Sequence, residues 1–210
     1  MKKLLSLMLA ALMAALVLCS CSAKKNADSS NGSEGGDGAS AVESAEETAE
    51  NPLFTWKIKI DGVEYTLPFD YSEAAANGFT FDSSKDMELG SRTYALFSPQ
   101  LNKGDDHFSV QFWNPTSEKA ASLADCKIGQ VSFRAANPIE VVLPGGLVFD
   151  ETVTVQTILD KYGEPERINE QEDYTSITYK EGVYNTVSFM FYTKDASEAR
   201  LNEVTLQNLV

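Results

Sequence analysis

The sequence is poor in histidine and cysteine, side chains on which nucleophilic enzymes and many metal sites depend. It has one histidine, His107, and three cysteines. Cys126 and His107 form a nucleophile–base pair only in a formal sense, and we expect Cys126 to be a small, partly buried apolar residue instead. Asp105, Asp106 and His107 are adjacent on an extended segment, so their side chains point apart and indicate a solvated loop. We therefore expect no catalytic residue, no metal site and no cofactor.

Basic residues are also scarce. The chain has 17 Lys and Arg against 31 Asp and Glu, which gives a formal net charge of −14. Four of the basic and seven of the acidic residues precede residue 52, which leaves 13 against 24 in the remainder. Nucleic acids and anionic lipid surfaces both attract basic protein surfaces. The composition therefore argues against nucleic acid as a partner and against docking of the folded part itself on a membrane.

The N-terminal hydrophobic run is too short to span a bilayer comfortably. Leu4 to Leu18 carries no charge, but a spanning helix needs about 20 apolar residues. Lys2 and Lys3 precede the run and small residues follow it, which is the pattern of a secretory signal. We expect residues 1–20 to be a signal peptide that is removed from the mature protein.

The end of this run, "LVLCSC", resembles the lipobox of bacterial lipoproteins. Leu18 and Ser20 stand three residues and one residue before Cys21, as an aliphatic and a small residue do in that pattern. The resemblance implies that Cys21 becomes the first mature residue and carries the lipid, whereas Cys19 leaves with the signal peptide. Cys126 would then be the one free thiol, which rules out an intramolecular disulfide. The alternative is an ordinary secretory signal with a chance cysteine.

Residues 21–51 contain almost no large apolar side chain. Gly, Ser, Ala and acidic residues dominate, as in "SSNGSEGGDGASAVESAEETAE". Such a segment cannot bury enough apolar surface to offset the entropy lost on ordering. We expect a flexible acidic tether here, followed by one domain built from residues 52–136 and 137–210.

The second half of this domain has the clearest pattern. Thr154 is a candidate N-cap, an apolar stripe at helical spacing follows, and Gly163 and Pro165 can end the helix. Three strand-like runs come next, "DYTSITYK", "NTVSFMFYTK" and "RLNEVTLQNL", the first two joined by a turn. The pattern predicts one helix followed by three strands.

The first half carries a weaker copy of the same order. A short helix capped by Ser72 and stopped at Gly78 precedes "RTYALFSP", "DHFSVQFWNP" and "CKIGQVSFRA". Residues 108–113 correspond to 187–192, and residues 128–133 correspond to 201–206. Any two amphipathic strands look alike, but the recurrence of order and spacing favours an internal repeat. A hairpin with Asp61-Gly62 as its turn opens the domain.

These tandem units, with "TVQTILDKYGEP" opening the second, resemble the β-lactamase-inhibitor-protein-like (BLIP-like) fold over residues 54–210. The small outer-membrane assembly lipoproteins share one such unit. The chain is also similar to uncharacterised lipoproteins of Gram-positive gut bacteria with "YTLP…YSE…NG" and "LPGG…YGEP" segments. The resemblance implies an α+β fold: tandem helix-plus-three-strand repeats forming a curved antiparallel sheet with helices on one face.

Alternation along the strands separates two faces of this sheet. One is apolar and suits the core: Phe108, Val110, Phe112, Val131, Phe133, Val187, Phe189, Phe191, Val204 and Leu206. The other is polar with a few large side chains, and its candidate protein-binding residues are Gln111, Trp113, Arg134, Met190 and Tyr192. A mixed face with aromatic residues is typical of recognition surfaces, and also of a merely solvated sheet.

We therefore expect a non-enzymatic binding protein, extracytoplasmic and anchored to the bacterial cell membrane through lipid on Cys21. Its partner would be another envelope or extracellular protein, or a ligand. A cell-surface inhibitor of a hydrolase is the alternative, and it rests on the BLIP-like resemblance because fold alone does not carry function.

Overall fold

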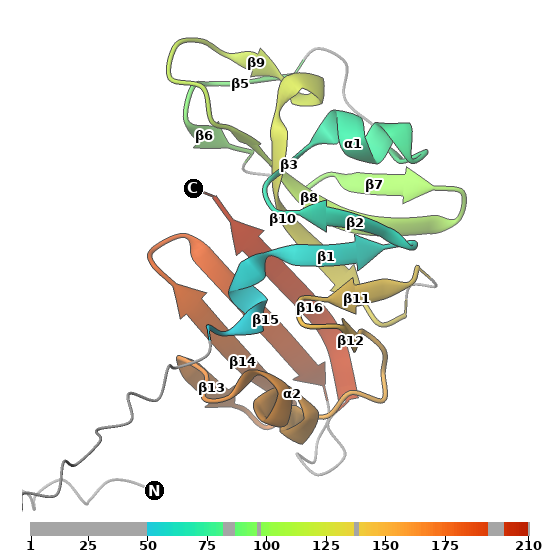
Figure 1. The fold of residues 1–210 in the computed structure, drawn as a ribbon, viewed down its shortest axis with the longest axis vertical. Helices are drawn as coiled ribbons and strands as arrows, with labels where there is room; N and C mark the ends of the chain where they lie inside the picture. The colour runs from blue at the N-terminus through green and yellow to red at the C-terminus, as the bar shows by residue number, and fades with distance from the viewer. Residues whose placement is uncertain (1–49, 82–86, 96–97, 137–138, 193–199, 210) are drawn as a thin grey trace, which may run out of the picture. The chain divides into compact units, whose positions relative to one another are not determined.

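The large antiparallel sheet organises the folded part of the chain (Figure 1). The computed structural model describes residues 50–81, 87–95, 98–136, 139–192 and 200–209. All of them belong to one compact unit, residues 47–210. The predicted signal peptide, Cys19, Cys21 and nearly all of the predicted tether lie outside the described residues.

Ten strands form this sheet, and every pair within it is antiparallel. The main path runs β13-β14-β15-β16-β10-β8-β7-β4, with β3 paired to β10 and β6 paired to β8. The bounds are β3 (Phe69–Asp70), β4 (Thr80–Phe81), β6 (Thr93–Tyr94), β7 (Gln100–Lys103), β8 (Asp106–Asn114), β10 (Lys127–Arg134), β13 (Arg167–Glu170), β14 (Tyr174–Glu181), β15 (Asn185–Tyr192) and β16 (Arg200–Asn208).

A second sheet of four strands has the order β12-β11-β1-β2. Its bounds are β1 (Lys57–Ile60), β2 (Val63–Thr66), β11 (Val141–Leu143) and β12 (Leu147–Val148). The predicted hairpin is confirmed as β1–β2, and Asp61 and Gly62 both have positive φ, as a tight hairpin turn requires. β1 also pairs with β11, some 80 residues later in the chain, through Lys59 opposite Val142.

The smaller elements are η1 (Pro52–Thr55), η2 (Leu123–Asp125) and the strand pair β5 (Glu88–Leu89) with β9 (Ala121–Ser122). Asn51 caps η1 by accepting from the Leu53 backbone N–H, and its Nδ2 donates to the Tyr162 carbonyl at 2.9 Å. This bond ties the start of the domain to the end of helix α2.

Both helices are short. Helix α2 (Val155–Tyr162) starts as predicted, because Thr154 Oγ1 accepts the Thr157 backbone N–H at 3.1 Å, and Gly163 follows with φ of +74°. Helix α1 (Tyr71–Ala76) is capped by Asp70, whose N–H donates to the Glu73 carboxylate at 3.1 Å, so the prediction of Ser72 as the cap is wrong.

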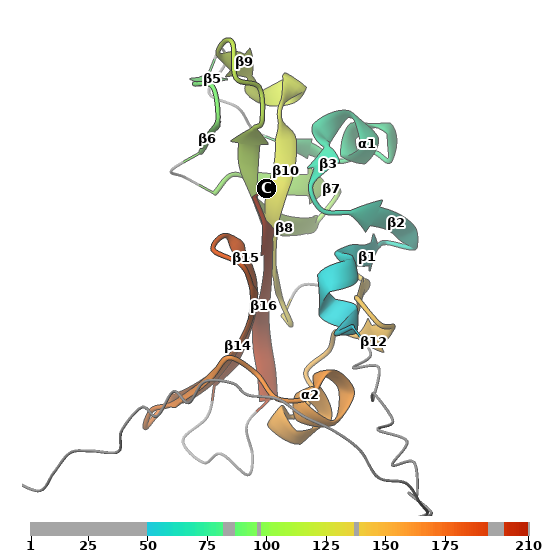
Figure 2. The same cartoon turned by 60° about the vertical axis from the view of Figure 1, so that its left-hand side comes forward.

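The expected α+β class with repeated helix-plus-three-strand units is wrong, because the fold is largely antiparallel β. The two α-helices of the described residues have six and eight residues, too few to cover a sheet of this width. Figure 2, where the large sheet is seen nearly edge-on, shows the small sheet lying on the same side as both helices. The small sheet supplies the cover that the prediction assigned to helices.

The predicted strand positions were right for most of the large sheet. Strands β8, β10, β14, β15 and β16 lie within or nearly within the expected runs. Among the described residues of "RTYALFSP", however, the strand is the two-residue β6, which pairs with the end of β8, and the longer partner of β8 on that side is β7, further on. Strand β13, between α2 and β14, was not predicted.

The core lies between the large sheet and its cover. All ten residues predicted for the apolar face are buried, and Phe133 contacts Phe108 with ring centroids 4.9 Å apart. Two buried tyrosines on the α2 side keep their hydroxyls bonded: Tyr162 donates to the Pro144 carbonyl at 2.9 Å and Tyr179 to the Gly163 carbonyl at 2.8 Å. Burial raises the pKa of both phenols, that of Tyr179 to about 12.

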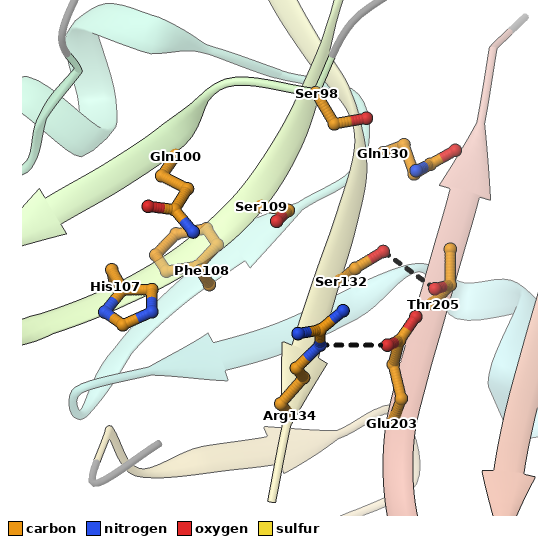
Figure 3. Close-up of a pocket in the computed structure, with 10 residues that line it drawn as sticks. All are labelled: Ser98, Gln100, His107, Phe108, Ser109, Gln130, Ser132, Arg134, Glu203 and Thr205. Carbon is orange, nitrogen blue, oxygen red and sulfur yellow. Dashed lines mark hydrogen bonds and ion pairs between the residues drawn. The ribbon is translucent and has the colours of Figure 1, made fainter. Parts of the chain in front are cut away.

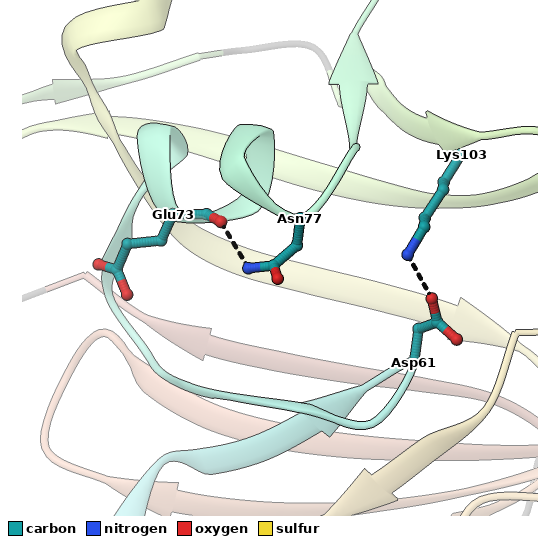
Figure 4. Close-up of polar contacts among 4 residues, drawn as sticks. All are labelled: Asp61, Glu73, Asn77 and Lys103. Carbon is teal, nitrogen blue, oxygen red and sulfur yellow. Dashed lines mark hydrogen bonds and ion pairs between the residues drawn. The ribbon is translucent and has the colours of Figure 1, made fainter.

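Polar contacts fix the α1 side of the cover (Figure 4). Asn77 Nδ2 donates to the Glu73 carbonyl at 2.9 Å and closes the end of α1. Lys103 on β7 pairs with Asp61 in the β1–β2 turn, and its Nζ lies 5.3 Å from the centre of the Phe79 ring. These contacts link the turn of the small sheet to β7 of the large sheet.

The pairs β8–β10 and β15–β16 have matching registers. Ser109 lies opposite Ser132, and Ser188 lies opposite Thr205. Each pair also contains one extra residue at the corresponding place, Gly129 in β10 and Asn202 in β16. The predicted internal repeat stays a prediction, because register describes geometry and not ancestry.

Candidate functional site

The face of the large sheet that points away from the small sheet is the candidate site. Alternation places short and long polar side chains on it, most of them half-buried. We call this the open face.

A row of hydroxyl side chains crosses the open face at right angles to the strands. We call it the hydroxyl row; it consists of Ser109, Ser132, Thr205, Ser188 and Thr178, each opposite the next in the strand pairing. Ser132 Oγ and Thr205 Oγ1 are 2.7 Å apart, whereas Thr178 Oγ1 and Ser188 Oγ are 3.4 Å apart. Gln100 on β7 continues the row beyond Ser109.

Three of the five residues of the hydroxyl row form the floor of a trough with a volume of about 370 Å³. Ser109, Ser132 and Thr205 are short, whereas their neighbours on the same strands are long, so the surface is hollowed between them. Gln130 stands at one side of the trough, and Arg134 and Glu203 stand at the other (Figure 3). Ser98, Gln100 and His107 complete the lining from the β7 end.

Arg134 and Glu203 lie opposite each other on β10 and β16. Arg134 Nε donates to Glu203 Oε2 at 3.2 Å, and the two side chains are 73% and 31% exposed. Figure 3 shows the guanidinium of Arg134 between His107 and Glu203, with its far end turned toward the hydroxyl floor. An exposed pair of this kind adds little stability, but it places a planar donor and an acceptor at the same edge of the trough.

The trough is lined by one arginine and one carboxylate. Their formal charges cancel, and the other lining groups are hydroxyls, amides, the imidazole of His107 and a phenylalanine whose ring is buried. A strongly charged ligand of either sign would be repelled by one of these groups, an anion by Glu203 and a cation by Arg134. The lining is thus suited to hydrogen bonding rather than to ion binding.

The five predicted binding residues share the open face but do not form one cluster. Trp113 lies opposite Lys127 near one corner, and Tyr192 lies opposite Arg200 near the diagonal corner. Strand spacing and rise put these two corners roughly 30 Å apart. Gln111 Nε2 is engaged with the Ala95 carbonyl at 2.7 Å, and Met190 lies opposite Glu203. Of the five, Arg134 alone lines the trough.

Cys126 and His107 are not positioned to act together. Cys126 comes just before Lys127, the β10 residue that pairs with Trp113 on β8. His107 lies six residues before Trp113 on the same strand, so Cys126 and His107 are roughly 20 Å apart. Cys126 is buried, and burial raises the pKa of its thiol to about 11. In the described ranges, no group of three or more His, Cys, Asp or Glu side chains could hold a metal ion.

Strand alternation predicts that small hydroxyl residues share the open face, but it indicates no role for them. Alternation assigns Ser109, Ser132, Ser188 and Thr205 to one face, but only register shows that they lie side by side. Gln100 was missed because β7 was missed. The sequence signal that could have suggested the trough is a Ser or Thr at the corresponding position of several predicted strands.

No protein-family model matches the chain, and comparison with curated proteins and with solved structures gives no match. Within the described residues, no helix has the length and apolar content to cross a membrane. The BLIP-like resemblance and the lipid anchor therefore stay predictions.

Proposed function

We propose that the protein is a lipid-anchored extracytoplasmic binding protein that engages its partner through the open face and does no chemistry on it. The observation that carries the proposal is the trough. It is a polar hollow on a sheet face that no described element covers (Figure 2), built on hydrogen-bonded strands. Concave sites with a few convergent polar groups are the usual place for ligand binding.

The anchor is tested by changing each N-terminal cysteine. Cys21→Ala should release the full-length protein from membranes into the soluble fraction, because the lipid would have no attachment site. Cys19→Ala is the matched control and should stay in the membrane fraction. Fractionation followed by immunoblotting reads both variants, and retention of both in the membrane contradicts the anchor.

The binding face is tested by photo-cross-linking on intact cells. A benzophenone side chain in place of Met190 or Tyr192 samples the open face, and one in place of Lys59 or Glu64, both exposed on the small sheet, is the control. Benzophenone inserts into C–H bonds of any chemical class, so the test does not presume what the partner is. Adducts from the open face alone support the proposal. Adducts from neither face, or equally from both, contradict it.

A hydrolase inhibitor is the second candidate, and one observation favours it. The β14–β15 turn carries Val183 and Tyr184, which are 73% and 55% exposed, and Gln207 Nε2 supports the turn by donating to the Tyr184 carbonyl at 3.0 Å. A supported apolar tip could fill a catalytic cleft. Micromolar inhibition of a hydrolase, lost in Val183→Ala/Tyr184→Ala, supports this function; no inhibition across a panel of hydrolases removes it.

A further inference from the structure

We propose that the trough binds an uncharged, hydroxyl-rich ligand, namely a short segment of neutral glycan. This inference rests on the proposed function, since it names the class of ligand that the open face would take. It follows from the hydrogen-bonding groups of the trough, from its charge and from its shape.

The floor requires a ligand that can both donate and accept hydrogen bonds. Ser109, Ser132 and Thr205 present hydroxyls, and each hydroxyl is one donor and two acceptor sites. Ser132 and Thr205 already share one hydrogen bond, so each has capacity for another partner. An apolar ligand would remove these groups from water without replacing their bonds, which is unfavourable. Sugar hydroxyls offer both functions at close spacing.

The edges fit the same chemistry. The Gln130 amide on one side offers a donor and an acceptor, and the Arg134–Glu203 pair on the other offers a planar donor beside a carboxylate acceptor. Adjacent hydroxyls of a sugar ring can bond to such bidentate groups. Water can fill the gaps between ligand and floor without much loss of affinity.

Charge argues against an anionic ligand. The single guanidinium of the trough is paired with Glu203, and the folded part of the chain carries 13 basic against 24 acidic residues. A carboxylated or sulfated glycan would have to displace Glu203 and approach a negative surface. A cationic ligand would meet Arg134 in the same way.

Shape argues for a narrow, extendable ligand. A volume of about 370 Å³ lies toward the low end of small-molecule sites, which run from about 300 to 1,000 Å³. Beyond Thr205 the hydroxyl row continues through Ser188 and Thr178. From β7 to β14 the row crosses six strands, about 24 Å at the usual strand spacing. A chain of sugar units can follow such a row.

The experiment measures binding of defined oligosaccharides to the full-length protein in detergent. The probes are neutral di- to tetrasaccharides of glucose, galactose, mannose and N-acetylglucosamine, together with uronic-acid and sulfated counterparts. Calorimetry and NMR titration give the dissociation constants. We expect at least one neutral probe to bind and its charged counterpart to bind more weakly.

Two double variants form a matched pair. Ser132→Ala/Thr205→Val removes two hydroxyls from the floor of the trough and should weaken disaccharide binding roughly tenfold, as expected for the loss of two hydrogen bonds. Thr178→Val/Ser188→Ala removes the same chemistry from the same row outside the trough. It should leave disaccharide binding within about twofold of the original protein, because those hydroxyls lie beyond the ligand.

Three results would overturn the inference: no neutral probe binds, charged probes bind better, or both double variants weaken binding equally. If no probe binds but open-face cross-links on cells persist, the ligand class is wrong and the proposed function stands. If a neutral glycan binds in the trough but Cys21→Ala stays in the membrane fraction, the anchor is wrong and the ligand class stands.

Discussion

Ser132 and Thr205 lie opposite each other on β10 and β16, with their hydroxyl oxygens 2.7 Å apart. They are also the residues that correspond when residues 128–133 are aligned with residues 201–206. Moving outward from this pair, Ser109 and Ser188 occupy matching positions on the next strands. The residues of the open face thus correspond in pairs about these two hydroxyls. The trough lies toward Ser109, on the side where Arg134 and His107 have no counterparts of the same type.

Removal of the Phe133 ring from the centre of the core should destabilise the folded protein. Phe133 is fully buried in β10 and contacts Phe108, so Phe133→Ala is expected to lower the free energy of unfolding by about 3–5 kcal/mol. Tyr192→Ala is the control: Tyr192 is 52% exposed, so the change should stay within about 0.5 kcal/mol. Urea denaturation followed by tryptophan fluorescence measures both, and similar losses would contradict the assigned core.

The bulge residue Gly129 should not tolerate a side chain. A Cβ there would lie 2.4 Å from Leu209 Cδ2 and 3.2 Å from the Asn208 carbonyl oxygen of β16. The Leu209 methyl can rotate away but the backbone cannot, so Gly129→Ala should cost about 1–3 kcal/mol. Gly90→Ala is the control, because its Cβ would meet nothing closer than 3.5 Å. Equal melting temperatures for the two variants would show that β10 and β16 separate more easily than described.

The buried tyrosines should make the protein labile in alkali. Burial raises the pKa of Tyr162 and Tyr179 above the value of an exposed phenol, to about 12 for Tyr179. As pH rises, the unfolded chain therefore loses these phenol protons before the folded chain does. The contribution of the two protonated phenols to the free energy of unfolding is present below about pH 10 and is lost as pH rises toward about 12.

Tyr162→Phe/Tyr179→Phe is the control for this pH effect. It should be less stable near neutral pH, because the hydroxyls donate to the Pro144 and Gly163 carbonyls, but it should lose less further stability in alkali. Unfolding free energies at several pH values between 9 and 12 provide the measurement. An identical alkaline slope for both proteins would refute the role of the phenols.

Cys126 should be chemically inert in the folded protein. With a thiol pKa of about 11, about one molecule in a thousand carries the reactive thiolate at pH 8. In Cys19→Ser/Cys21→Ser, where Cys126 is the one thiol, iodoacetamide should react at least roughly a hundredfold more slowly than in the same chain in urea. Rapid labelling of the folded chain would mean that Cys126 is accessible.

Local patterns predicted the local elements. Thr154 and Gly163 mark helix α2 and Asp61-Gly62 marks the first hairpin, because caps and tight turns depend on a few neighbouring residues. Alternation assigned the buried face of the large sheet, since strand periodicity is also local. The fold class failed because β1 pairs with β11, and no local pattern reports a pairing between segments so far apart.

The trough failed to appear in the prediction for the same reason. Ser109, Ser132 and Thr205 come from three strands, and their adjacency depends on the register of β10 against β8, which shifts at the bulge residue Gly129, and on the register of β10 against β16. The predicted binding face was based on the large aromatic residues Trp113 and Tyr192, which lie near opposite corners of the open face. Small side chains between long ones make the hollow, and composition-based reasoning gives small side chains little weight.

The bond from Asn51 to the Tyr162 carbonyl has a mechanical consequence. A pull arriving along the chain at Asn51 reaches the end of helix α2 through this bond and reaches β1 through η1. Because β1 is hydrogen-bonded on both sides, to β2 and to β11, such a load is shared among several elements and cannot peel off a sheet edge. Tension on the chain at Asn51 would therefore be borne by the cover of the fold, and the open face could keep its geometry under load.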